Sequence, residues 1–213
     1  MKKITLLIAA ASLMATASYG ALAQTVTATG NPSTDGWTSV NNEFFKDSTD
    51  WALFGTGGNA VYTFGDLGIG ESAAINFQLV GGVGTGDFVG LDFQDGGTTG
   101  IGFNFQGGGS NFNVFDFDNQ VTDSGIGFTN SFQTIKLTNV DNTNYTLSIG
   151  GTDFTGLQLN GGTAIDSMRI FNDTTGVGND VAFNNLNVVP EPETFALLAG
   201  LLALASIATR RRK

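Results

Sequence analysis

Short runs of alternating apolar and polar residues recur along the middle of the chain, and they constrain its fold more than any other feature. In one run, Ile75, Phe77 and Leu79 alternate with Asn76 and Gln78. A period of two puts the apolar side chains on one face of a strand, which indicates half-buried antiparallel β-strands. No stretch between residues 24 and 189 has the apolar stripe of an amphipathic helix. The sequence therefore predicts an all-β protein.

Glycine pairs separate these runs at intervals of about ten residues and supply the positive φ angles that tight turns need. The expected strands lie at residues 51–54, 60–64, 73–80, 88–93, 101–105, 112–117, 132–139, 144–149, 164–171 and 181–189. So many short strands in one domain favour an antiparallel two-sheet β-sandwich, most simply a jelly roll. A parallel β-helix is the alternative, although no fixed repeat supports it.

The C-terminal tail predicts a membrane segment. Residues 194–209 carry no charge, and as a helix they would span roughly 24 Å, against about 30 Å of hydrocarbon. Arg210, Arg211 and Arg212 follow, and such cations stay on the cytoplasmic side. The preceding body is therefore expected on the far side of the membrane, joined to this transmembrane helix by a stiff proline-containing neck.

The neck and tail together resemble the PEP-CTERM sorting signal of bacteria that make exopolysaccharide. The motif residues are Pro190, Glu191 and Pro192, followed by the apolar stretch and the arginine cluster. In that family the tail is the address read by a membrane protease-transpeptidase, the exosortase. The resemblance implies that this protein is an exosortase substrate, and an ordinary tail anchor with a proline hinge is the alternative.

The N-terminus has the features of a cleaved signal peptide. Lys2 and Lys3 precede an apolar run, and Ala21 and Ala23 fit the small-x-small pattern for signal peptidase before Gln24. A permanent N-terminal anchor is the alternative, but the apolar run is short for one. The expected organisation is a signal peptide (1–23), a β-sandwich domain (24–189) and a sorting and anchor segment (190–213), exported across the inner membrane.

The charge and the missing residue types exclude several functions. Residues 24–189 contain 17 acidic residues against Lys46, Lys136 and Arg169, a net charge of −14. Such a body would be repelled by phosphate backbones, so nucleic acid is not an expected partner. The chain has no histidine and no cysteine, which excludes Ser-His-Asp and Cys-His catalysis, histidine zinc sites and disulfides.

A second resemblance concerns the end of the body. Residues 164–171, a polar loop and residues 180–188 look like the closing strands of concanavalin A-like and laminin G-like jelly rolls. The resemblance implies a lectin-like sandwich that binds sugar or calcium at its loops. Glucanases of this fold carry a Glu-x-Asp-x-x-Glu strand motif, whereas Glu43 and Glu71 are the only glutamates of the body and neither lies in one. The protein is therefore not expected to be an enzyme.

Two acidic clusters are candidate calcium sites, although no cofactor is required by the sequence. Asp116 and Asp118 would share one strand face, and Asp173 and Asp180 flank a loop rich in oxygen ligands and glycine. Neither cluster reproduces an EF-hand loop. The alternative is that these aspartates are solvent-facing residues and ordinary turn formers.

Trp37 and Trp51 are candidate platforms for stacking on sugar rings, with burial in the core as the alternative. The function expected is that of an exported, exosortase-processed surface or exopolysaccharide-matrix protein with a non-catalytic structural or adhesive sandwich. A lectin-like carbohydrate-binding module is the alternative, and a polysaccharide hydrolase that uses aspartates alone is the third hypothesis. The expected partners are signal peptidase, exosortase, extracellular polysaccharide and, before processing, the membrane.

Overall fold

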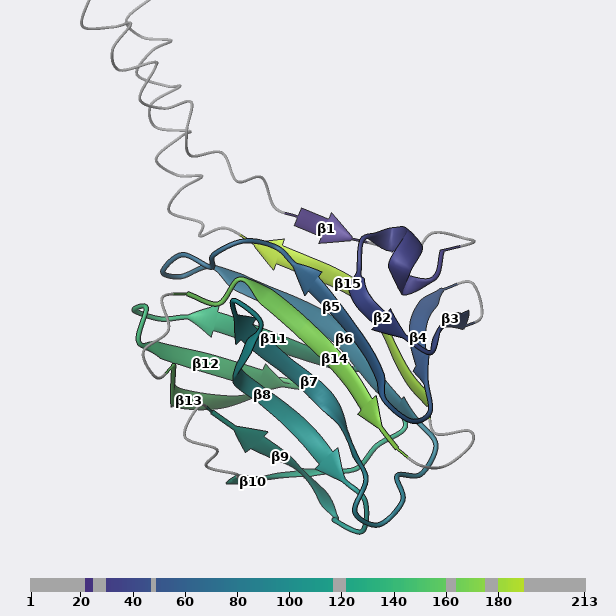
Figure 1. The fold of residues 1–213 in the computed structure, drawn as a ribbon. Helices are drawn as coiled ribbons and strands as arrows, with labels where there is room; N and C mark the ends of the chain where they lie inside the picture. Colours follow the sequence, from purple (N-terminus) through teal and green to yellow (C-terminus); the bar gives the residue numbers. More distant parts are fainter. Residues whose placement is uncertain are drawn as a thin grey trace, which may run out of the picture.

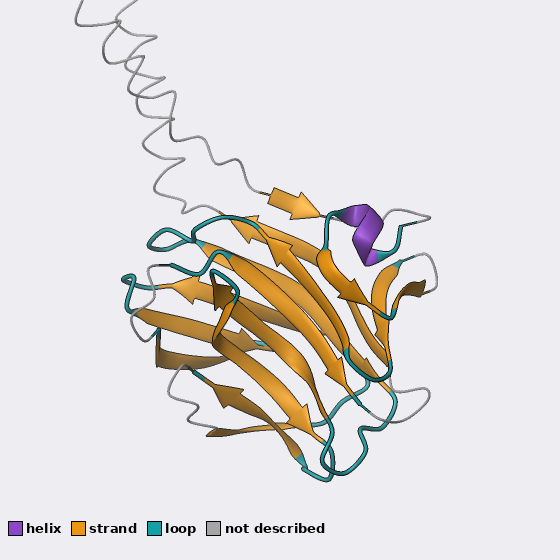
Figure 2. Cartoon of the chain, viewed as in Figure 1, coloured by secondary structure: helices purple, strands orange, loops and turns teal. Residues whose placement is uncertain are grey.

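Two antiparallel β-sheets pack face to face in the computed structural model, which describes residues 22–24, 30–46, 49–116, 122–159, 164–174 and 180–189. Figure 1 looks onto the seven-stranded sheet, with the eight-stranded sheet behind it. Among the described residues the single helical element is a short 3-10 turn, η1 (Pro32–Asp35) (Figure 2). The predicted all-β sandwich with a jelly-roll-like fold is confirmed, and the parallel β-helix is excluded because the described strand pairs are antiparallel.

The eight-stranded sheet has the order β13-β12-β11-β6-β15-β4-β3, and β1 adds to one side of β15. Its strands are β1 (Leu22–Gln24), β3 (Glu43–Lys46), β4 (Asp50–Phe54), β6 (Ser72–Val80), β11 (Gln133–Asn139), β12 (Asn144–Ile149), β13 (Thr152–Gln158) and β15 (Asp180–Val189).

The seven-stranded sheet has the order β10-β9-β8-β7-β14-β5-β2. Its strands are β2 (Thr38–Asn41), β5 (Gly58–Thr63), β7 (Phe88–Asp95), β8 (Thr98–Gln106), β9 (Asn111–Phe115), β10 (Thr122–Gly127) and β14 (Ser167–Asp173). The two closing strands, β14 and β15, therefore lie in different sheets, each between strands from much earlier in the chain. This long-range pairing places β14 in the middle of the face that carries the candidate site.

The core lies between the sheets and is filled by the apolar positions of the alternating runs. Phe103 packs edge-to-face against both Phe77 of the opposite sheet (ring centroids 5.1 Å apart) and Phe112 (5.4 Å). Such offset aromatic pairs add to the stabilisation from burial alone. On β6, the same alternation leaves Asn76 and Gln78 on the outer face of the eight-stranded sheet.

Trp37 and Trp51 are buried in this core, so neither ring can serve as a sugar platform at the surface. Their ring centroids lie 5.6 Å apart, and Trp37 also packs against Tyr62 and Phe183. The Trp51 indole Nε1 donates a hydrogen bond to Asp35 Oδ2 at 2.7 Å, which satisfies its polar atom. These contacts correct the sugar-stacking hypothesis for both tryptophans, because large apolar rings gain more from burial between the sheets.

All ten expected strands are present, with shifts of a few residues at their ends. β14 begins at Ser167, whereas the predicted strand began three residues earlier, at residue 164. The reason is that the carbonyl oxygen of Asp166 accepts hydrogen bonds from the backbone N–H groups of Phe64 and Gly65. Five strands were not predicted: β1, β2, β3, β10 and β13.

The predicted membrane signals fall mostly outside the described residues. This applies to Ala21, to the sorting motif Pro190, Glu191 and Pro192, to Arg210, Arg211 and Arg212, and to the predicted membrane segment. Ala23 and Gln24, on either side of the predicted signal cleavage, pair with Asn187 and Leu186 as part of β1. Among the described residues no helix is long and apolar enough to span a bilayer.

Candidate functional site

The outer face of the seven-stranded sheet, which points away from the other sheet, carries polar residues that are unusually buried. On β7, Leu91 and Phe93 point into the core, so Gly90, Asp92 and Gln94 belong to the outer face. Asp92 is nevertheless 0% exposed. Charged residues are seldom fully buried unless they are paired, so this position requires a partner.

Arg169 of β14 is that partner. The two residues face each other in the β7–β14 register. Arg169 Nε donates to Asp92 Oδ2 at 3.1 Å, Nη2 donates to the same oxygen, and Nη2 also donates to Thr99 Oγ1 at 3.3 Å. Burial raises the pKa of Asp92, and the hydrogen bonds and positive charge of Arg169 partly offset that rise. The guanidinium is thus held in one orientation while its side chain stays 36% exposed.

A hollow of about 370 Å³ opens beside this arginine, hereafter the Arg169 hollow. It is lined by Gly57, Gly58, Asn59, Phe88, Arg169, Phe171, Asn172 and Asp173. This volume lies within the roughly 300–1,000 Å³ typical of small-molecule sites. The lining comes from Gly57 and the start of β5, the start of β7 and residues 169–173 of β14, which lies between β5 and β7 in the sheet.

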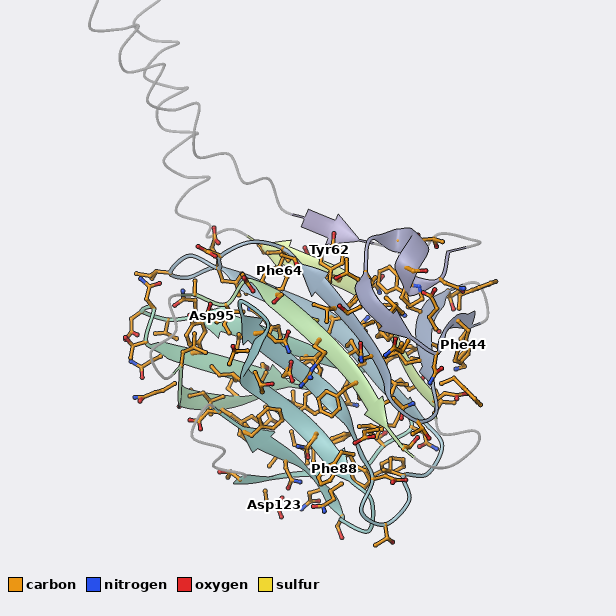
Figure 3. All side chains as sticks on the ribbon, viewed as in Figure 1. Phe44, Tyr62, Phe64, Phe88, Asp95 and Asp123 are labelled. Atoms are coloured by element: carbon orange, nitrogen blue, oxygen red, sulfur yellow. The ribbon has the colours of Figure 1, made fainter. Side chains whose placement is uncertain are left out.

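Two aromatic rings give the Arg169 hollow its apolar surface. The ring centre of Phe171 lies 5.3 Å from the guanidinium carbon of Arg169, a cation–π contact. Phe171 also covers Gly90, where an added Cβ would lie 2.8 Å from its ring. Phe88 is 37% exposed and pairs with Asp173 beside the end of β14 (Figure 3). The hollow therefore combines flat apolar surfaces with a fixed donor and carboxylate and amide groups.

A second hollow of about 570 Å³ lies between the edges of the two sheets. It is lined by Val114, Asp116, Thr122 and residues 153–158 of β13. Asp116, one of the candidate calcium ligands, contributes a buried Oδ1 that has no hydrogen-bond partner among the described residues. Asp118, its expected companion, lies outside the described residues.

The candidate calcium residues that the structure describes, Asp116, Asp173 and Asp180, are distributed over both sheets. Asp116 follows β9, which is three strands away from the β14 strand of Asp173, or roughly 14 Å at the usual spacing. Asp173 and Asp180 lie on different sheets, and burial raises the pKa of Asp180 while Lys46 lowers it. Within the described ranges no three acidic residues come together in a way that could hold a metal ion. Calcium binding therefore stays a prediction.

Sequence reasoning missed Phe88, Arg169 and Phe171 as site residues. One signal was available, because Arg169 is one of only three cations in residues 24–189 and stands between the apolar residues Met168 and Ile170. The two phenylalanines gave no such signal, since phenylalanines of the same alternating pattern fill the core.

No family model matches this chain, and no curated protein does. Solved structures do share its fold. The β-glucanase of Bacillus licheniformis superposes with a TM-score of 0.55 at 14% identity, over 82% of this chain and 100% of that one. An alginate lyase of polysaccharide lyase family 7 gives a TM-score of 0.52 at 9% identity, over 78% of this chain and 93% of the lyase.

A sugar-binding domain has the same architecture. The ligand-binding domain of botulinum neurotoxin serotype D, solved with N-acetylneuraminic acid, gives a TM-score of 0.50 at 12% identity. The superposition covers 83% of this chain and 44% of the toxin chain, so this chain spans less than half the length of that relative. At these identities the likeness establishes the sandwich fold, which hosts both sugar-binding domains and polysaccharide-cleaving enzymes.

Proposed function

We propose that this protein is an exported, non-catalytic carbohydrate-binding protein that binds extracellular polysaccharide at the Arg169 hollow. The observation that carries the proposal is the pairing of a fixed guanidinium with two aromatic rings, Phe88 and Phe171, in one hollow. Sugar rings present apolar C–H faces and a rim of hydroxyl groups, which match aromatic surfaces and fixed polar groups respectively. The fold likeness to a sugar-binding toxin domain is consistent with this role.

The spacing of the carboxylates near the hollow favours binding over hydrolysis. Glycosidases place two carboxyl groups about 5–9.5 Å apart. Asp92 is paired with Arg169 of β14. Asp173 lies four residues after Arg169 on the same strand, roughly 13 Å away at the usual strand rise. This separation is too large for the two-carboxylate mechanism, so the hollow is proposed to hold a glycan without cleaving it.

The sequence signals at the two ends support the cellular part of the proposal. Signal peptidase would cut before Gln24, and exosortase would recognise Pro190, Glu191 and Pro192 with the arginine cluster, leaving the sandwich at the cell surface or in the exopolysaccharide matrix. In a host with exosortase, the Pro190→Ala/Pro192→Ala variant should accumulate as the unprocessed, membrane-associated form. Processing unchanged by the double substitution would count against this assignment.

The binding proposal is tested with a matched pair of phenylalanine variants of the purified protein. Phe88 in the hollow is 37% exposed, and Phe132, beside β11 and not part of the hollow, is 36% exposed. Affinity for a panel of bacterial polysaccharides is measured by titration calorimetry. We expect Phe88→Ala to lose about tenfold in affinity, or about 1.4 kcal/mol, and Phe132→Ala to bind like the wild type. Equal affinities for both variants would place the binding surface elsewhere.

A further inference from the structure

The electrostatics of the Arg169 hollow bear on which class of polysaccharide it can take. An isolated arginine in a hollow would favour a carboxylate-bearing sugar. Here the positive charge is already paired, because Nε and Nη2 both donate to Asp92, which is fully buried. The guanidinium Nη1 has no hydrogen bond to the described part of the chain. The arginine therefore offers the hollow a fixed hydrogen-bond donor with little uncompensated charge.

The remaining charges around the hollow are negative. Asp173 is exposed and lines the same hollow, and among the described residues that line it Arg169 is the only cation. With Asp92 behind the arginine, the two carboxylates outnumber the single cation. The whole of residues 24–189 adds a net charge of −14, which repels polyanions at long range.

The other lining groups suit an uncharged sugar. Phe88 and Phe171 provide apolar surface, and Asn59 and Asp173 provide an amide and a carboxylate that can bond hydroxyl groups. Gly57 and Gly58 bring no side chains into the hollow. This composition matches a mostly apolar site with a few oriented polar groups.

We propose that the Arg169 hollow binds a neutral glycan segment and discriminates against acidic, uronate-containing polysaccharides. The inference rests on the proposed function, which it deepens by naming the ligand class. Hydroxyl groups of the sugar accept hydrogen bonds from Arg169 Nη1 and donate to Asp173, while the C–H faces pack on Phe88 and Phe171. Because no net charge is exchanged, binding depends little on salt.

The test measures binding of the purified full chain to a neutral β-glucan and to a polyuronate. Each is titrated at ionic strengths of about 0.01 M and about 1 M, between which the Debye length falls from about 30 Å to about 3 Å. We expect the glucan affinity to change less than about twofold and to fall about tenfold in Phe88→Ala but not in Phe132→Ala. The polyuronate should bind at least about tenfold more weakly than the glucan at low salt.

A charge reversal at the rim provides the second variant. Asp173→Lys should create salt-sensitive binding of the polyuronate, whereas Asp153→Lys, at an exposed aspartate of β13, should not. Polyuronate binding by the wild type equal to or tighter than glucan binding overturns this inference and leaves the proposed function standing. Glucan binding that is unchanged in Phe88→Ala places the binding surface elsewhere and overturns both this inference and the hollow as the binding site. Binding of neither polymer, nor of any polysaccharide in the panel, overturns the proposed function and this inference together.

Discussion

At the scale of single residues, replacing Arg169 alone should lower the free energy of unfolding more than replacing Arg169 and Asp92 together. Arg169→Ala would leave the buried Asp92 carboxylate without its partner. Because the arginine side chain is 36% exposed, we expect a loss of about 2–3 kcal/mol in the free energy of unfolding, between the values for surface and buried pairs. Urea denaturation of both single variants and of Asp92→Leu/Arg169→Ala measures this. A double variant less stable than Arg169→Ala would contradict the expectation.

The raised pKa of Asp92 has a defined effect on stability against pH. Burial raises its pKa above the ordinary value of 3.8 in the folded protein. The folded state therefore holds this proton more tightly, and the resulting stabilisation is fully present below pH 3.8 and is lost as the pH rises through the folded pKa. Relative to Asp92→Asn, the wild type should lose unfolding free energy as the pH rises across that window. If the difference in unfolding free energy between the wild type and Asp92→Asn is constant with pH, the raised pKa of Asp92 is contradicted.

Gly90 is predicted to be irreplaceable on the outer face of β7. An added Cβ would lie 2.2 Å from the carbonyl oxygen of Phe103 and 2.8 Å from the ring of Phe171. Overpacking of this kind should cost about 1–3 kcal/mol or more, so Gly90→Ala should unfold at clearly lower urea concentration. Gly82→Ala is the control, because an added Cβ there has no atom within 4 Å and should change stability by less than about 0.5 kcal/mol.

At the scale of elements, the turn between β11 and β12 depends on Asp141. Its Oδ1 accepts hydrogen bonds from the backbone N–H groups of Thr143 (3.0 Å) and Asn144 (2.7 Å). Its Oδ2 accepts a hydrogen bond from Asn144 Nδ2 (2.9 Å). The Asn144 side-chain hydrogen bond, followed by the two backbone ones, lowers the pKa of Asp141 below 3.8. The ionised form is therefore the stabilising one, present above pH 3.8 and lost as the pH falls through the folded pKa.

Asp141→Ala should accordingly lower the melting midpoint at pH 7 and approach the wild type in acid. Thermal unfolding of both proteins across this pH range measures the effect. Asp153→Ala removes an exposed aspartate from the neighbouring strand β13 and serves as the control. If Asp141→Ala and Asp153→Ala lower the melting midpoint equally at pH 7, the loss comes from removing a surface charge and not from the turn.

The elements that the sequence predicted differ physically from those it missed. Strands buried on one face, such as β6 and β11, show the apolar alternation that burial imposes. β2, β3, β10 and β13 are the outermost strands of the two sheets, where little of each strand is buried and the alternation is weak. β3, β10 and β13 pair with the adjacent strand in the chain, and β2 pairs with β5, so backbone pairing rather than an apolar face places these strands. The Arg169 hollow was missed for a different reason, since β5, β7 and β14 are far apart in the sequence and meet only after the sheet has formed.

At the scale of the whole molecule, the acidic surface should make stability depend on salt. The chain has a net charge of −10 at pH 7, and residues 24–189 contain 17 acidic residues against three basic ones. Mutual repulsion of these charges destabilises the compact state, and salt screens it. Raising the ionic strength from about 0.01 M to about 0.15 M should therefore raise the melting midpoint at pH 7. Near the sequence pI of about 4.1 the effect should be small.

The same experiment separates charge screening from a calcium site. Sodium, magnesium and calcium chlorides compared at equal ionic strength should raise the midpoint by similar amounts if the aspartates are solvated surface groups. An ion bound at a specific site stabilises the native state beyond the effect of screening. This extra stabilisation grows with the ratio of the free ion concentration to the dissociation constant of the site. An extra rise with calcium that disappears in Asp180→Asn or Asp173→Asn would identify the loop between β14 and β15 as its site. An extra rise that disappears only in Asp116→Asn would assign the ion to the end of β9, because the two positions lie too far apart to share one ion.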